Sequence, residues 1–319
     1  MRLLIATLCL AVVFWCSSCS PTPSTDKSRA NNNFAAPTLD VQNGSNALQY
    51  VARLLELGER DAGTPGAETA AKWIMEELRA AGLPEVQIES FVDTTPDGPA
   101  TFHNVLAMMR GNSPTRILLL SHFDTKSKIS TAERKFQGAN DSGSSTGLLL
   151  ELAAVLAKQL KRPPLYTIQW AFLDGEECRY SYGPHDGLHG SRYLANKMKS
   201  EGVNFKAVIL LDMIGDRNLQ VTMPRNSTPA LKAFVFKAAS ALGVRNKFSL
   251  YDGNILDDHH PFFEAGYPAV NLIDFTFGSS PGANDYWHTL EDTLDKLDSE
   301  SLRIVGNVVL KVIELCQNE

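Results

Sequence analysis

The sequence predicts a three-layer α/β/α domain with a central mixed, mostly parallel sheet. Apolar runs that suit buried strands alternate along the chain with longer segments in which apolar residues recur at helical spacing. Several of these runs end in polar residues, as strands do at the ligand-binding edge of an open α/β sheet. The chain has 319 residues, 44% of them hydrophobic and 21% charged, which is enough apolar content for one large core.

The expected helices follow from apolar periodicity and from their start and stop signals. Pro65 suits the first turn of a helix and Gly82 its stop. Helices are expected over residues 47–57, 65–81, 145–160, 188–198, 229–242 and 299–316. Strands are expected over residues 86–92, 102–109, 116–121, 166–173, 207–211 and 269–273. The first two strands flank the turn sequence Thr-Pro-Asp-Gly at 95–98, so we expect a hairpin at an edge of the sheet.

The first 43 residues are expected to lie outside this domain, which then spans residues 44–319. Residues 1–18, with Arg2 before an apolar stretch, are typical of a secretory signal and too short to span a membrane comfortably. Small residues before Cys19 resemble a bacterial lipoprotein site, although Cys16 stands where leucine is usual. Residues 19–43 form an expected flexible tether. We therefore expect an exported, periplasmic or cell-envelope protein, with a lipid on Cys19 as its only membrane contact.

Charge and cysteine content exclude some functions. The net charge of −6 gives no reason to expect a nucleic-acid partner. Only Cys178 and Cys316 lie beyond the leader region, so no disulfide framework is indicated. Cys178 follows an acidic pair directly, and a buried bystander role is favoured over a metal role.

The acidic pair Glu176-Glu177 is the most informative feature of the chain. It follows a strand-like run that ends at Asp174-Gly175. A buried carboxylate is costly unless it is paired or bound to a metal. Two adjacent glutamates can point in different directions, so one can bind a metal while the other moves protons. The alternative is two solvated loop acids, and the pair alone does not decide between them.

Other metal-type residues stand at similar places. His122 ends one apolar run, Asp212 ends another, Asp141 lies in a glycine-rich turn before a helix, and His288 lies in a loop after the last strand. These residues also have structural alternatives. His122 could be a strand-end histidine bonded to backbone, Asp212 a turn residue, and Asp141 a helix N-cap. Together with Glu177 they are expected at one rim of the sheet, where histidine and carboxylates suit catalytic zinc.

These residues belong to motifs that resemble a known family. The motifs are Gly63-Thr-Pro-Gly66, Ser121-His-Phe-Asp-Thr-Lys126, Gly138-Ala-Asn-Asp141, Asp174-Gly-Glu-Glu177, His189-Gly-Ser-Arg192, Leu211-Asp-Met-Ile-Gly215, Asp257-Asp-His-His-Pro-Phe262 and Trp287-His-Thr289. From about residue 60 to the last helix, the chain resembles the animal-type, zinc-dependent glutaminyl cyclases, which share their fold with the M28 zinc aminopeptidases. The resemblance implies an acyltransferase that converts the N-terminal glutamine of peptides or proteins to pyroglutamate and releases ammonia.

The two branches use the metal residues differently. The cyclase resemblance implies one zinc ion held by Asp141, Glu177 and His288. The alternative, a di-zinc aminopeptidase that hydrolyses N-terminal residues, would give His122 and Asp212 to one zinc, Glu177 and His288 to the other, and Asp141 to both. His122 and Asp212 would otherwise support the ligands from behind.

The resemblance also implies the remaining roles. Glu176 would carry the proton from the attacking amine to the leaving nitrogen, while Asp212 and Asp257 would hydrogen-bond that nitrogen and steady Glu176. The residues expected to contact substrate are Trp287, Tyr182 and Lys126. The long segment 178–188, Trp287 before the last ligand and the doubled Asp257-Asp258 favour the cyclase branch over the peptidase branch.

The chain also departs from the animal cyclases. Tyr182 stands where they carry tryptophan, Ser121 stands where mammalian members have a disulfide cysteine, and the loop 275–285 is longer. These departures concern the shape of the pocket more than the chemistry. A third interpretation, a catalytically silent binding protein on this scaffold, is disfavoured because the acidic pair and the other ligand-type residues are intact.

Overall fold

The computed structural model describes residues 34–37 and 41–319. The expected signal peptide, the expected lipidation site Cys19 and most of the expected tether lie outside the described residues. Within the described part, no helix has the length and apolar character needed to cross a membrane. Cys178 and Cys316 are buried free thiols.

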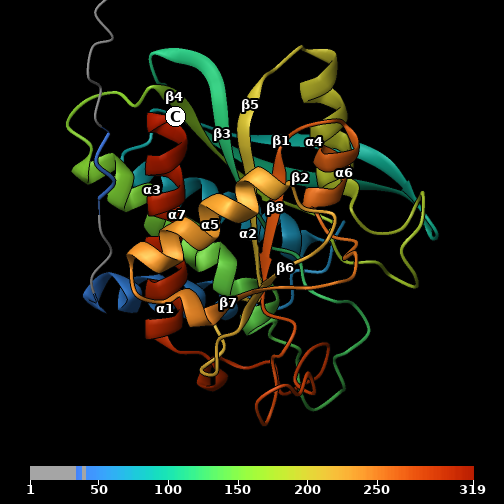
Figure 1. The fold of residues 1–319 in the computed structure, drawn as a ribbon. Coiled ribbons are helices and arrows are strands. Elements are labelled where there is room, and N and C mark those ends of the chain that lie inside the picture. Colours follow the sequence, from blue (N-terminus) through green and yellow to red (C-terminus); the bar gives the residue numbers. More distant parts are fainter. Residues whose placement is uncertain (1–33, 38–40) are drawn as a thin grey trace, which may run out of the picture. The chain divides into compact units, whose positions relative to one another are not determined.

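A mixed sheet forms the centre of the domain (Figure 1). Its strands are β1 (Glu85–Thr95), β2 (Gly98–Met109), β3 (Ser113–His122), β4 (Tyr166–Leu173), β5 (Phe205–Asp212), β6 (Val221–Met223), β7 (Phe248–Leu250) and β8 (Ala269–Ile273). The order across the sheet is β1-β2-β4-β3-β5-β8-β6-β7, and the central strands β4, β3, β5 and β8 are parallel neighbours. The antiparallel β1–β2 hairpin lies at one edge, which confirms the prediction.

Helices cover both faces of the sheet (Figure 1). The helices are α1 (Val41–Glu56), α2 (Pro65–Ala80), α3 (Ser145–Gln159), α4 (His189–Ser200), α5 (Pro229–Ala241), α6 (His259–Glu264) and α7 (Ser299–Asn318), with short helical turns at Ala139–Ser144, Arg245–Lys247 and Leu294–Lys296. Helices α1, α2, α3, α5 and α7 pack on one face, and α4 and α6 pack on the other. The three-layer α/β/α class is therefore confirmed.

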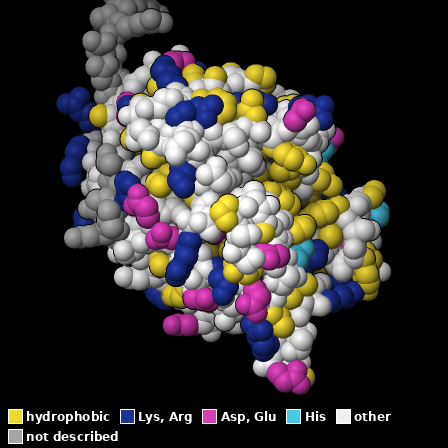
Figure 2. Space-filling model, turned by 60° about the horizontal axis from the view of Figure 1, so that its bottom comes forward, with side chains coloured by type: hydrophobic (Ala, Val, Ile, Leu, Met, Phe, Trp, Pro, Cys, Tyr) yellow, Lys and Arg dark blue, Asp and Glu magenta, His cyan; other side chains and the backbone are white. Residues whose placement is uncertain are grey.

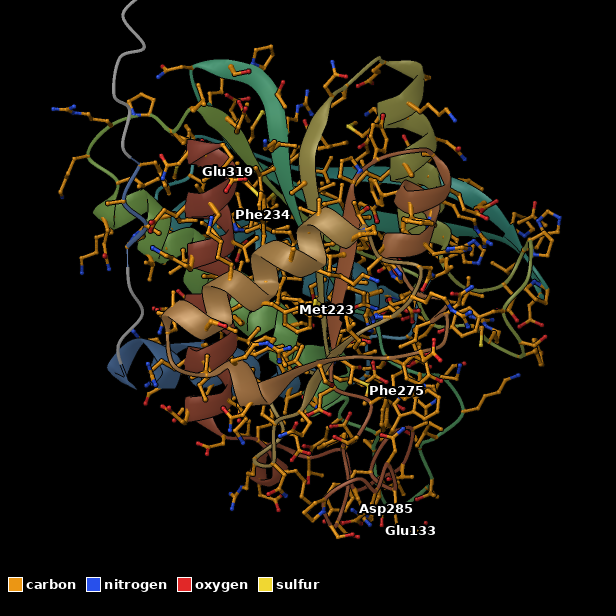
Figure 3. All side chains as sticks on the ribbon, in the orientation of Figure 1. Glu133, Met223, Phe234, Phe275, Asp285 and Glu319 are labelled. Atoms are coloured by element: carbon orange, nitrogen blue, oxygen red, sulfur yellow. The ribbon has the colours of Figure 1, made fainter. Side chains whose placement is uncertain are left out.

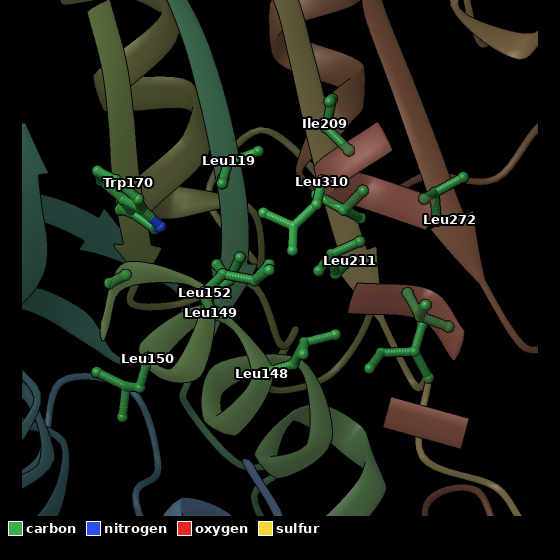
Figure 4. Close-up of a cluster of buried hydrophobic side chains, with 14 of the residues drawn as sticks. Leu119, Leu148, Leu149, Leu150, Leu152, Trp170, Ile209, Leu211, Leu272 and Leu310 are labelled. Carbon is green, nitrogen blue, oxygen red and sulfur yellow. The ribbon is translucent and has the colours of Figure 1, made fainter. Parts of the chain in front are cut away.

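The central strands are buried on both faces because their alternate side chains enter different cores. In β3, Leu119 packs into the core under α3 and α7, whereas Leu118 and Leu120 pack toward α4 and α6. Figure 4 shows Leu119 and Trp170 from the sheet packed against leucines of α3. This two-sided burial explains why these strands appear in the sequence as continuous apolar runs.

Some elements were not predicted. The three-residue strands β6 and β7 and the six-residue helix α6 are too short to show a periodic pattern. The predicted long helices and central strands are present, and β1 and β2 extend through to Thr95 and Gly98. Helix α1 begins at Val41 instead of the expected residue 47, so its first turn lies within the segment expected to be tether. The site described next lies beyond the carboxyl ends of the central strands.

Candidate metal centre and active site

The strand ends bring the metal-type residues to one edge of the sheet. His122 is the last residue of β3, Asp212 is the last residue of β5, and Glu177 follows β4 by four positions. Asp141 lies in the helical turn before α3, and His288 lies in the loop after β8. Because the central strands are parallel, their carboxyl ends share one edge, so these residues converge as the sequence predicts.

Asp141, Glu177 and His288 form a compact set of ligand atoms. One ligand atom from each lies within 4.8 Å of the others. Nε2 of His288 lies 2.9 Å from Oε1 of Glu177 and 3.3 Å from Oδ2 of Asp141. Ligand atoms of a tetrahedral zinc are about 3.3 Å apart, given Zn–N and Zn–O bonds near 2.0–2.1 Å. One imidazole and two carboxylates at this spacing fit a zinc ion with an open coordination position.

The electrostatics of this trio agree with a cation site. Burial alone lowers the pKa of His288, but the neighbouring carboxylates of Asp141 and Glu177 outweigh it and raise that pKa to about 10. Burial and the charge of Asp141 raise the pKa of Glu177 above its ordinary value. Two buried carboxylates this close need a compensating positive charge, which a metal ion or a protonated imidazole supplies.

A second group shares Asp141 with the first. His122, Asp141 and Asp212 also offer ligand atoms within 4.8 Å of one another. Nε2 of His122 lies 3.2 Å from Oδ1 of Asp141 and 3.5 Å from Oδ1 of Asp212. The arrangement therefore provides either a second cation position or a buried histidine that supports Asp141 and Asp212.

Two further aspartates, to which the sequence analysis assigns no role, bind the backbone of the acidic pair and of Asp141. Asp124 accepts the backbone N–H of Glu176 through Oδ1 and that of Glu177 through Oδ2, each at 3.1 Å. Asp292 accepts the N–H of Asn140 at 2.7 Å and of Asp141 at 3.1 Å. Asp124 lies in a motif noted above, but the contact of Asp292 with a segment 151 residues away had no local signal.

The turn before the acidic pair requires glycine. Gly175 has a φ of +77°, and a Cβ there would lie 2.7 Å from the ring of Phe102. The turn leaves Glu176 and Glu177 buried, at 5% and 6% exposure. Burial, reinforced by the charges of Glu177 and Asp257, holds the pKa of Glu176 well above its ordinary value, although His122 acts in the opposite sense. Glu176 is outside both ligand groups, so it remains available for proton transfer.

A cavity of about 550 Å³ opens onto these residues. It is lined by Asp141, Glu176, Glu177, Tyr182, Asp212, Tyr251, Asn254, Ile255, Leu256, Asp257, Ile273, Phe275, Asn284, Trp287 and His288. In Figure 3, Phe275 lies on the same side of the molecule as the loops that carry Glu133 and Asp285. Figure 2 shows apolar side chains next to acidic and histidine side chains on one face. The lining of the cavity combines apolar and aromatic side chains with carboxylates and an imidazole.

Two of the three residues expected to contact substrate line the cavity, and the third does not. Trp287 lines the cavity, and its ring stacks on that of His288 with centroids 4.0 Å apart. Tyr182 also lines the cavity. Lys126 is not among the lining residues: its Nζ lies 3.1 Å from Oε2 of Glu177 and 2.6 Å from the carbonyl oxygen of Cys178. Lys126 therefore contacts the candidate ligand Glu177 without lining the cavity.

Asp257 is fixed within the cavity by its own contacts. Its Oδ2 accepts a hydrogen bond from Nδ2 of Asn271 on β8 at 2.7 Å, and its Oδ1 accepts the N–H of Asp258 at 2.6 Å. Burial, with the charges of Asp212 and Asp258, raises the pKa of Asp257 well above its ordinary value. Asp212 and Asp257 thus line the same cavity as Glu176.

Comparisons with known proteins agree with an α/β fold that carries a candidate metal site. Residues 104–313 match the model of peptidase family M28, and the chain belongs to that family. A glutaminyl-peptide cyclotransferase from Bos taurus is 30% identical over 293 residues, which cover 81% of this chain and 78% of the relative.

Solved structures of both branches of the family, the glutaminyl cyclases and the aminopeptidases, resemble this chain. The crystal structure of a glutaminyl cyclase from an Acidobacteriales bacterium has a TM-score of 0.80 and 32% identity, with coverage of 91% of this chain and 98% of that one. A leucine aminopeptidase precursor from Bacteroides thetaiotaomicron has a TM-score of 0.75 and 27% identity, with coverage of 88% and 98%. Within family M28, the protein belongs with the zinc-dependent glutaminyl cyclases.

Proposed function

We propose that the protein is a glutaminyl-peptide cyclotransferase that acts on peptides or proteins with an N-terminal glutamine and holds one zinc ion through Asp141, Glu177 and His288. Support comes from the relatives that carry this activity in their names. The observation that carries the proposal is the position of Glu176. It is a buried carboxyl that faces the same cavity as the three ligands without belonging to them.

The reaction is an intramolecular aminolysis. The α-amine nitrogen attacks the carbon of the side-chain carboxamide, a new C–N bond closes a five-membered ring, and the bond to the amide nitrogen breaks. Glu176 takes the proton that the amine loses and delivers it to the departing nitrogen, which leaves as ammonia. A carboxyl with a raised pKa suits this shuttle, because general acid–base catalysis works best when the pKa is near the operating pH.

The bound metal and the other residues that line the cavity would assist the cyclisation. When bound, zinc would supply a Lewis acid that polarises the carboxamide oxygen. Asp212 and Asp257 line the cavity and would accept hydrogen bonds from the leaving nitrogen. Trp287 provides an aromatic wall against which the folded-back glutamine side chain packs, and such pre-organisation accounts for much of the rate of an intramolecular reaction.

A di-zinc aminopeptidase is the second candidate. The observation that favours it is the shared Asp141, which belongs to both ligand groups and is placed as a bridging carboxylate would be. On that account Glu176 would activate a water molecule for hydrolysis instead of serving an amine.

Two measurements separate the candidates. We expect the purified protein to contain about one zinc per chain and to leave Leu- and Ala-initiated peptides intact while it releases ammonia from Gln-initiated peptides. About two tightly bound zinc ions, with hydrolysis of the Leu- and Ala-initiated peptides and no ring closure, would establish the aminopeptidase.

We also propose that the enzyme is exported and held at the cell envelope by a lipid on Cys19, because of the leader-like sequence of residues 1–18. Metabolic labelling with a fatty acid tests this, with Cys19→Ser as the variant that should lose the label.

A further inference from the structure

The hydroxyl of Tyr182 lies directly on the expected proton carrier. Its oxygen is 2.9 Å from Oε1 and 3.1 Å from Oε2 of Glu176. A tyrosine hydroxyl has a single hydrogen, so it is shared between the two carboxylate oxygens. Tyr182 is 37% exposed whereas Glu176 is only 5% exposed, so the ring spans from the mouth of the cavity to its floor.

The loop that carries Tyr182 is built to hold this position. The carboxylate of Asp186 accepts the backbone N–H groups of Arg179, Tyr180 and Ser181, which shapes the turn just before Tyr182. The guanidinium of Arg192, on α4, donates to the carbonyl oxygens of Gly183 and Gly187 on the other side of the tyrosine. The loop is therefore tied at both ends.

The same loop is also tied to Glu176 and packed against the tyrosine ring. The N–H of Leu188 donates to the carbonyl oxygen of Glu176 at 2.9 Å. Gly187 has a φ of +76°, and a Cβ there would lie 2.6 Å from Cδ1 of Tyr182. Only glycine leaves room for the ring at this point. Aromatic packing alone would not require the hydroxyl to end on Glu176.

From these contacts we propose that Tyr182 is a positioning residue, whose hydroxyl fixes the carboxyl of Glu176 in the orientation that receives the proton of the attacking amine. The inference rests on the proposed function and adds a role to it. Glu176 has rotatable side-chain bonds, and neither ligand group restrains it. Loss of the hydroxyl would release the carboxyl while leaving the aromatic wall, the three zinc ligands and Trp287 in place.

The test compares Tyr182→Phe with Tyr193→Phe, in zinc-loaded protein and with a Gln-initiated peptide. Tyr193 on α4 is not among the residues that line the cavity, and its hydroxyl donates to Oε1 of Glu89 at 3.1 Å, so its variant is a matched loss of one tyrosine–carboxylate hydrogen bond. We expect Tyr182→Phe to lower kcat about tenfold or more, as for a lost hydrogen bond to a charged group, with KM changed less than about twofold. We expect Tyr193→Phe to leave kcat within about twofold of the wild type. An unchanged kcat for Tyr182→Phe, or a rise in KM alone, would overturn the inference.

A double-mutant cycle guards against a purely structural effect. Glu176→Asp withdraws the carboxyl by one methylene from the hydroxyl, so Tyr182→Phe should then cost less than about twofold. An equal loss in both backgrounds would show that Tyr182 does not act through Glu176, and would overturn the inference. If the wild-type protein hydrolyses peptides without ring closure, the proposed function is refuted but the role of Tyr182 is not. The same double-mutant cycle then measures whether Tyr182 acts through Glu176 in the hydrolytic reaction.

Discussion

The imidazole of His288 and the carboxylate of Glu177 lie 2.9 Å apart although 111 residues separate them in the chain. Asp141 joins them from a third segment. The three segments reach this point because parallel strands end at one edge of the sheet and the loop after β8 folds back over it. The candidate metal centre therefore depends on the fold of the whole domain, and the role of each of its residues can be tested separately.

Removal of one ligand should abolish tight metal binding. His288→Ala leaves two carboxylates without their imidazole, and we expect the zinc affinity to fall by about 100-fold or more, beyond the loss that is typical for supporting residues. Competition titration with a zinc indicator measures this. His260→Ala, a half-buried histidine on α6, is the control and should keep its zinc. Full zinc affinity in His288→Ala would remove the residue from the ligand set.

Glu176→Gln should separate metal binding from catalysis. The amide preserves the shape of the side chain but cannot carry the proton, so we expect kcat to fall by about 10²- to 10⁴-fold. Zinc content should stay at the wild-type level because Glu176 is outside the ligand groups. Steady-state kinetics and metal analysis of the same preparation provide both numbers. A variant that keeps its activity, or loses zinc along with it, is incompatible with the assigned role.

Asp292 should control the metal through the backbone of Asp141. Burial, with the charge of Asp141, raises the pKa of Asp292 to about 8, while its backbone donors and Arg60 act in the opposite sense. Asp292→Asn has only one acceptor oxygen for the two N–H groups of Asn140 and Asp141. We expect a 10- to 100-fold loss of zinc affinity, about the effect of other supporting residues.

The exposed Asp295→Asn is the matched control for that change. Its zinc affinity should equal that of the wild type. If Asp292→Asn also binds zinc as tightly as the wild type, the position of Asp141 does not depend on Asp292.

His259 should make the fold sensitive to acid. Burial, with a smaller contribution from His260, lowers the pKa of His259 to about 3 in the folded protein. The unfolded chain binds the proton near pH 6.5, so between about pH 6.5 and pH 3 it holds more protons than the folded chain. The free energy of unfolding should therefore fall by about 1.4 kcal/mol per pH unit on acidification through this range, from this group alone.

Urea unfolding at several pH values measures that slope. His259→Phe should remove this part of the pH dependence, whereas His185→Phe, at an exposed position, should follow the wild type. Protonation of the candidate metal ligands affects the wild type and both variants alike. The difference between their pH slopes therefore reports on His259. Parallel slopes for the wild type and His259→Phe would contradict the assignment.

The sequence supports predictions wherever a physical pattern is local. Burial on both faces makes the central strands apolar throughout, and the polar residue that ends each run marks the rim of the sheet. This is why the apolar runs alone place His122, Glu177 and Asp212 at one edge. The family resemblance then supplied the assignment of ligands and proton carrier, which the apolar pattern leaves open.

The features that the sequence did not predict depend mostly on contacts between segments far apart in the chain. The hydrogen bond that the backbone N–H of Asp141 donates to Asp292 and the contact of Lys126 with Glu177 arise from loop conformations that no periodicity encodes. Strands β6 and β7 are too short for a pattern to show. Tyr182 was expected at the substrate, but only the structure shows its hydroxyl on Glu176.

The products from one Gln-initiated peptide test the central claim most directly, because both candidate reactions act on the same substrate. After incubation with the zinc-loaded enzyme, mass spectrometry should show a peptide of unchanged residue number that has lost one ammonia and its free amine. Glu176→Gln should leave the substrate as it was. Free glutamine together with a peptide shorter by one residue, and no pyroglutamyl product, would contradict the account.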